Sequence, residues 1–214
     1  MKLFWSTSSP YARKVRIVLR EKRLLGDVDE IECNPYADPP ALRAVNPLGL
    51  IPTLVLDSGE ALYDSPVICA YLDAANATDC LIPSGTAQWI VRGAEALADG
   101  LLNLAVGLTV KLRRPPSEQS PASLARRRHA AVEAIAEMDR MRARLPTELT
   151  LGHIAIACAC SYLDFRPASV GSRWRQDHPA LADWHARLEA LPSFEQTRPS
   201  DGSYLRFASG PGSA

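Results

Sequence analysis

The first third of the chain mixes two kinds of hydrophobic pattern. Short apolar or alternating runs predict four strands, at residues 2–5, 28–32, 53–56 and 61–64. Turn-forming residues 57–59 separate the last two runs, so we expect those runs to pair as an antiparallel hairpin. From Pro10 to about Arg23, apolar residues recur at intervals of three and four, which predicts an amphipathic helix.

Two shorter helical patterns, at residues 41–45 and from Pro66 to about Ala75, complete a β-α-β-α-β-β-α order. No strand pattern follows, and periodic segments predict helices at about 86–112, 122–145, 151–165, 180–190 and 193–197. The fold class is therefore α/β plus all-α. The expected parts are an α/β domain at residues 1–77, a linker at 78–85, an all-helical domain at 86–198 and a mobile tail at 199–214.

Composition limits the partners that the protein can have. Its 214 residues include 24 Lys plus Arg and 24 Asp plus Glu, so no net charge favours nucleic acid. The five cysteines form no C-x-x-C pair, which argues against a disulfide framework or a zinc motif and favours a reducing compartment. The N-terminal apolar run ends at Trp5, too early for a signal peptide, and no apolar stretch looks long enough to span a bilayer. We expect a cytoplasmic protein with no metal, membrane or nucleic-acid partner.

Serine stands immediately before proline three times, each time where a predicted helix begins. These serines are Ser9, Ser65 and Ser120. Proline suits the first helical position, and a serine before it can cap the helix with about 1 kcal/mol of stabilisation. Capping alone therefore explains each pair, including Ser9, which ends the hydroxyl-rich stretch of residues 6–9.

Three segments resemble the cytosolic glutathione transferases, and the likeness covers roughly residues 1–198. Residues 8–19, SSPYARKVRIVL, resemble the start of the first helix in zeta- and omega-class members. Residues 46–72 are similar to the glutathione-site segment of the family, and residues 149–160 to the buried helix of its second domain. The resemblance implies a thioredoxin-like βαβαββα domain followed by an all-helical domain, with glutathione as co-substrate and a homodimeric assembly.

The glutathione-site segment implies roles for four residues. Asp64 would face the ammonium group of the γ-glutamyl end, while the Ser65 hydroxyl and the free amides of the helix start would hold its carboxylate. The Ile51–Pro52 bond would be cis, and the backbone of Ile51 would pair with the cysteinyl part. The local alternatives are a simple helix cap at Ser65 and an ordinary strand-entry proline at Pro52.

One position in that segment departs from the family pattern. Many relatives carry Lys or Gln near the glycyl carboxylate, where this chain has Leu50. Affinity for glutathione is then expected to be weaker, unless another cation such as Arg13 or Lys14 takes over. The resemblance also places Asn34, after the second strand, near the glycyl end.

A second departure lies in the buried helix of the second domain. The family usually has Asp at the third position after the Thr150 cap, where it completes a capping box. His153 stands there, so we expect a weaker cap. We assign His153 no catalytic role, and we expect the other histidines, His129, His178 and His185, on the surface.

The resemblance implies that the protein activates the thiol of glutathione. A free thiol has a pKa of about 8.5, so little thiolate exists at neutral pH. A hydrogen bond to the anion contributes about 1.5–3 kcal/mol and a helix N-terminus about 0.3–1, enough to lower the thiol pKa by about 2 units without a base. Alignment with the family places this donor at Ser9, with Ser8, Thr7 or no hydroxyl as alternatives. Omega-class relatives carry cysteine there, so a thiol transferase activity is disfavoured.

A second substrate would bind between the two domains. We expect a small apolar electrophile, in a pocket lined by Trp5, Tyr11, Leu101 and Leu104. The leading hypothesis is a glutathione transferase. The alternatives are a glutathione-dependent isomerase or dehalogenase, and a non-catalytic binding or regulatory protein on the same fold, which the Leu50 departure motivates.

Overall fold

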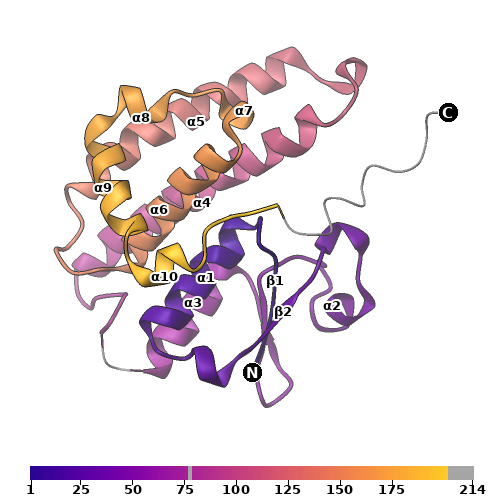
Figure 1. Cartoon of the computed structure of the whole chain (residues 1–214), viewed down its shortest axis with the longest axis vertical. Helices are drawn as coiled ribbons and strands as arrows, with labels where there is room; N and C mark the ends of the chain where they lie inside the picture. The colour runs from indigo at the N-terminus through magenta and orange to yellow at the C-terminus, as the bar shows by residue number, and fades with distance from the viewer. Residues whose placement is uncertain (77–78, 202–214) are drawn as a thin grey trace.

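A four-stranded mixed sheet forms the centre of the N-terminal part. The computed structural model describes residues 1–76 and 79–201, shown in Figure 1. The strands are β1 (Lys2–Trp5), β2 (Asp29–Glu32), β3 (Thr53–Val55) and β4 (Ala61–Leu62). Their spatial order is β2-β1-β3-β4, with β1 parallel to β2 and antiparallel to β3. Strands β3 and β4 form the expected hairpin, so the predicted strands are confirmed.

Three helices pack around this sheet. They are α1 (Pro10–Glu21), α2 (Pro40–Val45) and α3 (Ser65–Ala75). Figure 1 shows α1 and α3 side by side, between the strands and the helical part, and α2 on the far side of the strands. Short 3-10 turns, η1 (Leu25–Asp27) and η2 (Pro35–Ala37), flank β2. The layout places the start of α1 and the loop before β3 at one end of the sheet.

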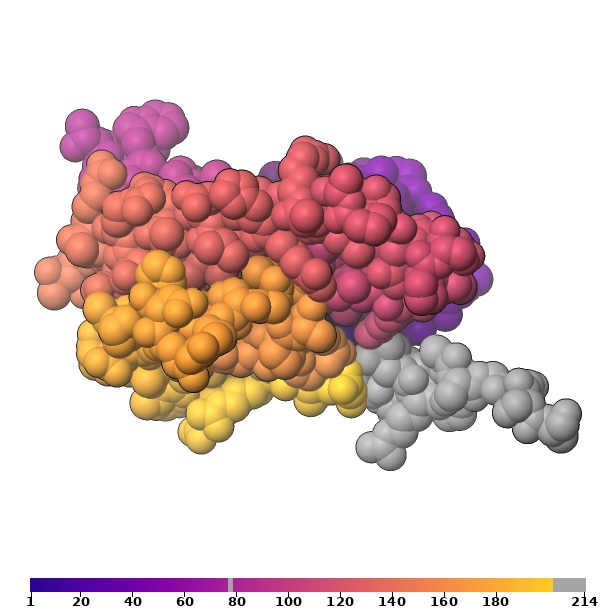
Figure 2. Space-filling view, turned by 90° about the horizontal axis from the view of Figure 1, so that it is seen from above, coloured from indigo at the N-terminus to yellow at the C-terminus, as the bar shows by residue number. Residues whose placement is uncertain are grey.

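The described residues from 79 to 201 contain helices and no strand, as the sequence predicts. The long helices are α4 (Ala87–Leu112), α5 (Pro121–Arg142) and α6 (Leu151–Phe165); the shorter ones are η3 (Pro116–Glu118), α7 (Pro167–Val170), α8 (Trp174–Asp177), α9 (Pro179–Glu189) and α10 (Pro192–Glu195). Figure 2 shows the rose to salmon residues of α5 extending along this face, with the orange residues of α7 to α9 against one side. The sequence missed α7 and α8, because one turn carries no periodic signal.

The two parts share one hydrophobic cluster. Val15 of α1 and Leu72 of α3 belong to it together with Ile154 of α6 and Phe194 of α10. A second cluster fills the space between α4, α5 and α6. Because buried side chains of both parts interlock, α1 lies at a fixed position relative to α4 and α6.

Helix α4 corrects one expectation. It has 26 residues, and an 18-residue stretch within it has a mean hydropathy of 1.2. By length and composition it could therefore cross a membrane, so the prediction that no segment has this property was wrong. Core packing explains its composition, since Ala98, Leu101 and Leu108 are fully or almost fully buried against α5 and α6.

The linker and tail predictions fall partly outside the described residues, at residue 78 and at residues 202–214 respectively. Residues 199–201 are described, and they are held in place. The Ser200 amide donates to the Thr7 carbonyl at 3.2 Å, and Asp201 forms an ion pair with Arg166. The start of the predicted mobile tail is therefore bound to both parts of the protein.

Candidate functional site

A cavity of about 310 Å³ lies between the two parts of the protein. One wall comes from the start of α1 and includes Ser8, Ser9 and Tyr11. The facing wall comes from the last turns of α4 and the end of α6, with Val106 and Arg113 among its residues. The loop before β3 closes one side. The cavity therefore joins the predicted glutathione-site segment to the helical part.

Ser9 holds its predicted position at the start of α1. Its Oγ accepts a hydrogen bond from the Ala12 amide at 3.2 Å, so it caps the helix. It also lines the cavity. A hydroxyl that accepts in this way still has its own proton to donate, and the positive end of α1 lies beside it. Capping and donation to a bound thiolate are therefore compatible.

The alternative hydroxyls differ in position. Ser8 lines the same cavity, whereas Thr7 is not among its lining residues. Tyr11 also lines the cavity, but its hydroxyl donates to Asn103 Oδ1 at 2.5 Å. Burial, with a smaller contribution from Asp99, raises the pKa of Tyr11. Because its one proton is used by Asn103, Tyr11 is a poorer donor to sulfur than Ser9.

Ser65 is not the cap of its helix. Helix α3 begins at Ser65, and Asp64 is the N-cap residue, whose carboxylate accepts from the Ser65 amide. The Ser65 hydroxyl is fully buried and has no hydrogen-bond partner in the described part of the chain. An unpaired buried hydroxyl costs about 1–3 kcal/mol. A carboxylate within reach of this hydroxyl would satisfy it, although neither Ser65 nor Asp64 is among the residues that line the cavity.

The loop before β3 is held by a residue that sequence reasoning missed. Asn46 is buried, and its amide donates to the Leu50 carbonyl at 3.1 Å and to Thr53 Oγ1 at 2.9 Å. The Ile51–Pro52 bond is cis. Ile51 lines the cavity, as does Leu50, which is 59% exposed. An Asn ahead of a Pro-Leu-Gly turn is a signal that could have been recognised as a loop brace.

The two cations suggested as substitutes at Leu50 point elsewhere. Arg13 is only 3% exposed and pairs with Glu189 at 2.7 Å, and Lys14 pairs with Asp99 at 2.7 Å. Neither lines the cavity. The suggestion was wrong because both side chains are engaged by carboxylates of the helical part, away from Leu50.

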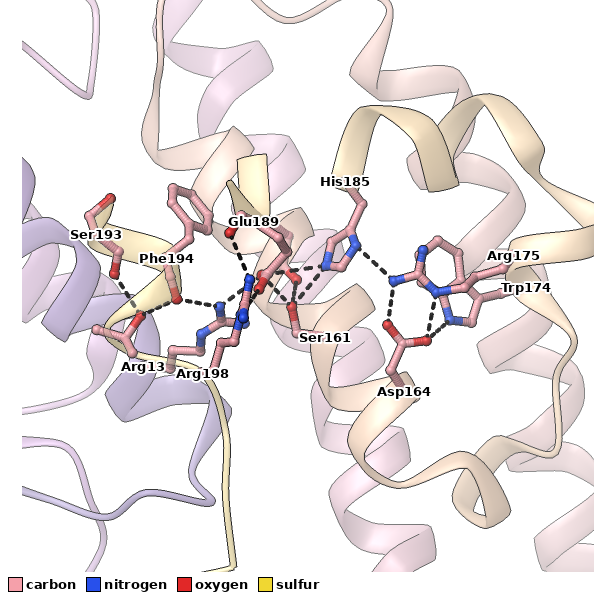
Figure 3. Close-up of polar contacts among 12 residues, drawn as sticks. Arg13, Ser161, Asp164, Trp174, Arg175, His185, Glu189, Ser193, Phe194 and Arg198 are labelled. Carbon is pink, nitrogen blue, oxygen red and sulfur yellow. Dashed lines mark hydrogen bonds and ion pairs between the residues drawn. The ribbon is translucent and has the colours of Figure 1, made fainter. Parts of the chain in front are cut away.

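Figure 3 shows where this polar stripe leads. Arg13 donates to Glu189 Oε1 and, at 3.0 Å, to the Phe194 carbonyl, which ties α1 to α9 and α10. Glu189 also accepts from the Ser161 hydroxyl of α6 at 2.8 Å. The network therefore joins α1 to three helices of the helical part, α6, α9 and α10.

His185 belongs to the same network, which corrects its assignment to the surface. It is 2% exposed, and its Nε2 lies 2.8 Å from Ser161 Oγ. Burial lowers the pKa of His185 to about 4, so the ring is neutral. Arg175, which can only donate, lies 3.1 Å from Nδ1, so the ring proton resides on Nε2. His185 then donates toward Ser161 and cannot act as its base, which excludes a Ser-His nucleophile here.

His153 fills the capping role that aspartate usually has at this position in the family. Its Nδ1 accepts from the Thr150 amide at 3.2 Å, completing the capping box of α6. The ring stacks on Trp184, and burial lowers the pKa of His153 to about 4. A neutral ring is required, since a protonated Nδ1 could not accept this hydrogen bond.

These two buried histidines predict acid sensitivity. Each has a folded-state pKa near 4 and an unfolded value of about 6.5. Because the folded-state pKa is lower than the unfolded one, the stability that each neutral histidine contributes is fully present above about pH 6.5. It is lost as the pH falls toward 4. We expect a loss of roughly 2 kcal/mol per histidine, measured by urea unfolding between pH 7 and 4.5. His153→Gln should flatten this dependence and the exposed control His129→Gln should not; equal slopes would contradict the assignment.

Four of the predicted residues have contacts away from the cavity. Asn34 caps η2 by accepting from the Tyr36 amide at 3.0 Å. The Arg16 guanidinium lies over the Trp5 ring, with its central carbon 3.5 Å from the ring centroid. Leu101 is in the helical core and Leu104 packs against it. None of these four predicted residues, Trp5, Asn34, Leu101 and Leu104, lines the cavity.

The α4 residues that do line it come later in the helix. They are Val106, Thr109 and Val110, followed by Arg113 just after the helix ends. The predicted α4 lining residues, Leu101 and Leu104, lie about one turn before the observed ones. Periodicity identifies which face of a helix is buried, but not how far along the helix a second domain packs. Tyr162 and Arg166, at the end of α6, were missed for the same reason.

Family models agree with this geometry. The glutathione S-transferase N-terminal domain matches residues 8–75, and the glutathione S-transferase C-terminal domain matches residues 121–187. The chain is 34% identical over 204 residues to the uncharacterized GST-like protein YibF of Escherichia coli strain K12. That alignment covers 93% of this chain and 98% of the relative.

Two solved structures are similar over almost their whole length. A glutathione transferase family member from Pseudomonas fluorescens Pf-5, with bound glutathione, has a TM-score of 0.88 at 38% identity, covering 94% of this chain and 99% of that one. A glutathione S-transferase from Methylobacillus flagellatus KT, with glutathione bound, has a TM-score of 0.85 at 36% identity, covering 93% and 99%. The fold is thus a thioredoxin-like domain joined to a helical domain, with a cavity between them. The chain belongs to the glutathione S-transferase family.

Proposed function

We propose that this protein is a glutathione transferase that activates the thiol of glutathione for attack on a small electrophile. The observation that carries the proposal is the position of Ser9. Its hydroxyl caps α1, retains a proton to donate and lines the cavity between the two parts. Ser9 is the proposed catalytic residue, as a hydrogen-bond donor to the thiolate rather than as a base or nucleophile.

The rest of glutathione would be held by the predicted site residues. The buried Ser65 hydroxyl and the first amides of α3 face the γ-glutamyl carboxylate, and Asp64 faces the ammonium group. The backbone of Ile51, beside the cis Pro52, pairs with the cysteinyl part. Leu50 and Asn34 lie toward the glycyl end.

The reaction that we propose needs no cofactor besides the co-substrate. The thiol proton passes to solvent, and the sulfur lone pair forms a carbon–sulfur bond with the electrophile. A leaving group departs with its bonding pair, or, for an activated alkene, the π pair moves to the neighbouring carbon, which takes a proton from water. Pro10, Val106 and Val110 supply apolar surface for the carbon skeleton of the electrophile.

We also propose a cytoplasmic homodimer. Exposed apolar side chains on two consecutive helices support an association surface: Val67 and Tyr71 on α3, and Trp89 on α4. Trp89 is 70% exposed, an unusual setting for the largest apolar side chain.

Ser65→Ala tests the glutathione site. We expect the Kd for glutathione to rise about tenfold in calorimetric titration, because a charge-assisted hydrogen bond is lost. In the absence of glutathione, thermal stability should stay the same or rise, because an unpaired buried hydroxyl is removed. A purely structural serine would give the opposite result, a loss of stability with unchanged affinity.

Ser58 is exposed, and Ser58→Ala is the control. It should leave both the Kd for glutathione and the thermal stability unchanged. Failure of the wild-type protein to bind millimolar glutathione would reject every enzymatic reading. Binding without conjugation of model electrophiles would instead favour the isomerase, dehalogenase or non-catalytic alternatives.

A further inference from the structure

The cavity wall that faces Ser9 carries positive charge. Arg113, just after the end of α4, and Arg166, just after the end of α6, both line the cavity, and Arg43 lines it on the side of the β3 loop. Among the described residues, the cavity has no Asp or Glu in its lining. A site for purely apolar electrophiles has no use for this excess of cations.

The three arginines differ in the hydrogen-bond and ion-pair partners that their guanidinium groups already have. Arg43 pairs with Asp38, donates to the Pro47 carbonyl at 2.8 Å and lies against Gly49. The Arg113 guanidinium, unlike the backbone amide of this residue, forms no hydrogen bond or ion pair within residues 1–76 and 79–201. Arg113 therefore brings to the cavity lining a charge that no carboxylate pairs directly. Such a group attracts an anion more strongly than a guanidinium that is already paired.

Arg166 shows that this wall can hold a carboxylate. Its guanidinium lies 3.7 Å from the Phe165 ring centroid, which fixes its plane, and it is paired with the carboxylate of Asp201. The Ser200 amide, bonded to the Thr7 carbonyl, holds the Asp201 backbone across the domain boundary. In Figure 1 the yellow chain after α10 crosses toward the start of α1. Hydrogen bonds from Arg166 hold the pKa of Asp201 below its usual range, and Arg113 contributes in the same direction.

We propose that the electrophile carries a carboxylate or a similar small anion, which Arg113 and Arg166 bind while the thiolate attacks at the Ser9 end of the cavity. Asp201 is the internal anion that this group displaces from Arg166. The inference rests on the proposed function and deepens it by naming the substrate class. The apolar surface of Val106 and Val110 then contacts the carbon skeleton between the two charged ends.

Two glutathione conjugates that differ by one carboxylate test this without any need for turnover. They are S-(4-carboxybenzyl)glutathione and S-benzylglutathione, titrated into the full-length protein by calorimetry at low salt. We expect the carboxylated conjugate to bind about tenfold tighter to wild type. Arg113→Gln should reduce this preference to about twofold or less and leave the affinity for S-benzylglutathione unchanged. Arg114→Gln, one residue along, is the control; Arg114 does not line the cavity and should leave the preference intact.

Asp201→Asn gives an independent reading. It frees Arg166, so the carboxylated conjugate should bind about threefold tighter, with no change for S-benzylglutathione. No preference in wild type, or a preference that survives Arg113→Gln, would overturn the inference. Equal weakening of both conjugates and of free glutathione in Arg113→Gln would also overturn it, by assigning Arg113 to glutathione itself. Failure of wild type to bind either conjugate or glutathione would reject the proposed function instead.

Discussion

Replacing Ser9 by alanine should raise the pKa of the glutathione thiol bound to this protein by about 1–2 units and slow conjugation about 10–100-fold near pH 6.5. Glutathione should still bind with a Kd within about threefold of wild type, because Ser65, Asp64 and the Ile51 backbone are untouched. The thiolate titration is followed by its ultraviolet absorbance on the protein–glutathione complex. The rate is measured with a model electrophile over the same pH range.

The magnitude follows from the kind of hydrogen bond that is removed. A hydrogen bond to a charged group contributes about 1.5–3 kcal/mol, and each pKa unit corresponds to about 1.4 kcal/mol. Below the thiol pKa, each unit lowers the thiolate fraction tenfold. The helix N-terminus remains in the variant and still contributes about 0.3–1 kcal/mol, so the thiol pKa should not return fully to its solution value.

Ser120→Ala is a closely matched control. Ser120 also precedes a proline, caps α5 and accepts from the Ser123 amide at 3.4 Å. Both variants lose a cap worth about 1 kcal/mol, so both should unfold at slightly lower temperature. Only Ser9→Ala should change the thiol pKa. An unchanged titration in Ser9→Ala would end the case for Ser9, and a shift in Ser8→Ala instead would transfer the role to Ser8.

The elements of this fold were predictable because they carry periodic signals. The strands and the long helices α4, α5 and α6 follow from alternation and from apolar stripes. The cap at Ser9 follows from its proline neighbour. The four-residue helices α7 and α8 were missed, since so few residues show no period, whereas α10, equally short, was predicted.

The site was less predictable, because it depends on how two separately patterned parts meet. Arg13 and Lys14 sit on a polar stripe that reads as solvent-exposed, and His185 sits in a polar helix. Arg13 and Lys14 are buried because each charge meets a carboxylate of the helical part. His185 is buried because its ring meets the Ser161 hydroxyl of α6, within the same part. Likewise, the sequence could not distinguish Ser65 from Asp64 as the cap of α3, since either side chain can accept at that position.

The buried position of Lys14 has the largest expected effect on stability. Its Nζ lies 2.7 Å from Asp99 Oδ2 and 3.1 Å from Glu95 Oε1, and Arg92 completes the cluster at 3.0 Å from Glu95 Oε2. Lys14 and Glu95 are almost fully buried. The cluster fastens α1, and with it the Ser9 cap, to α4.

Lys14→Met should therefore lower the free energy of unfolding by about 3–5 kcal/mol at pH 7.5, because two buried carboxylates then share the single counter-charge of Arg92. Burial already raises the pKa of Asp99, against the opposing effect of Lys14. Without Lys14 the folded-state pKa of Asp99 rises further. A raised carboxyl pKa means that stability is present at low pH and is lost as pH rises through that folded pKa. The difference in free energy of unfolding between Lys14→Met and wild type should therefore become smaller as the pH is lowered from 7.5 to 5, as measured by urea unfolding.

Two further variants make this prediction specific to the cluster. Lys14→Met combined with Asp99→Asn should regain at least half of the lost stability, because the second buried charge is removed. Lys2→Met removes an exposed lysine of β1 and should change stability by less than about 0.5 kcal/mol. Two results would contradict this prediction. One is a difference in unfolding free energy between wild type and Lys14→Met that stays constant or widens as the pH falls, and the other is a double variant no more stable than Lys14→Met. Either would show that Lys14 acts by packing its alkyl chain and not by neutralising Asp99 and Glu95.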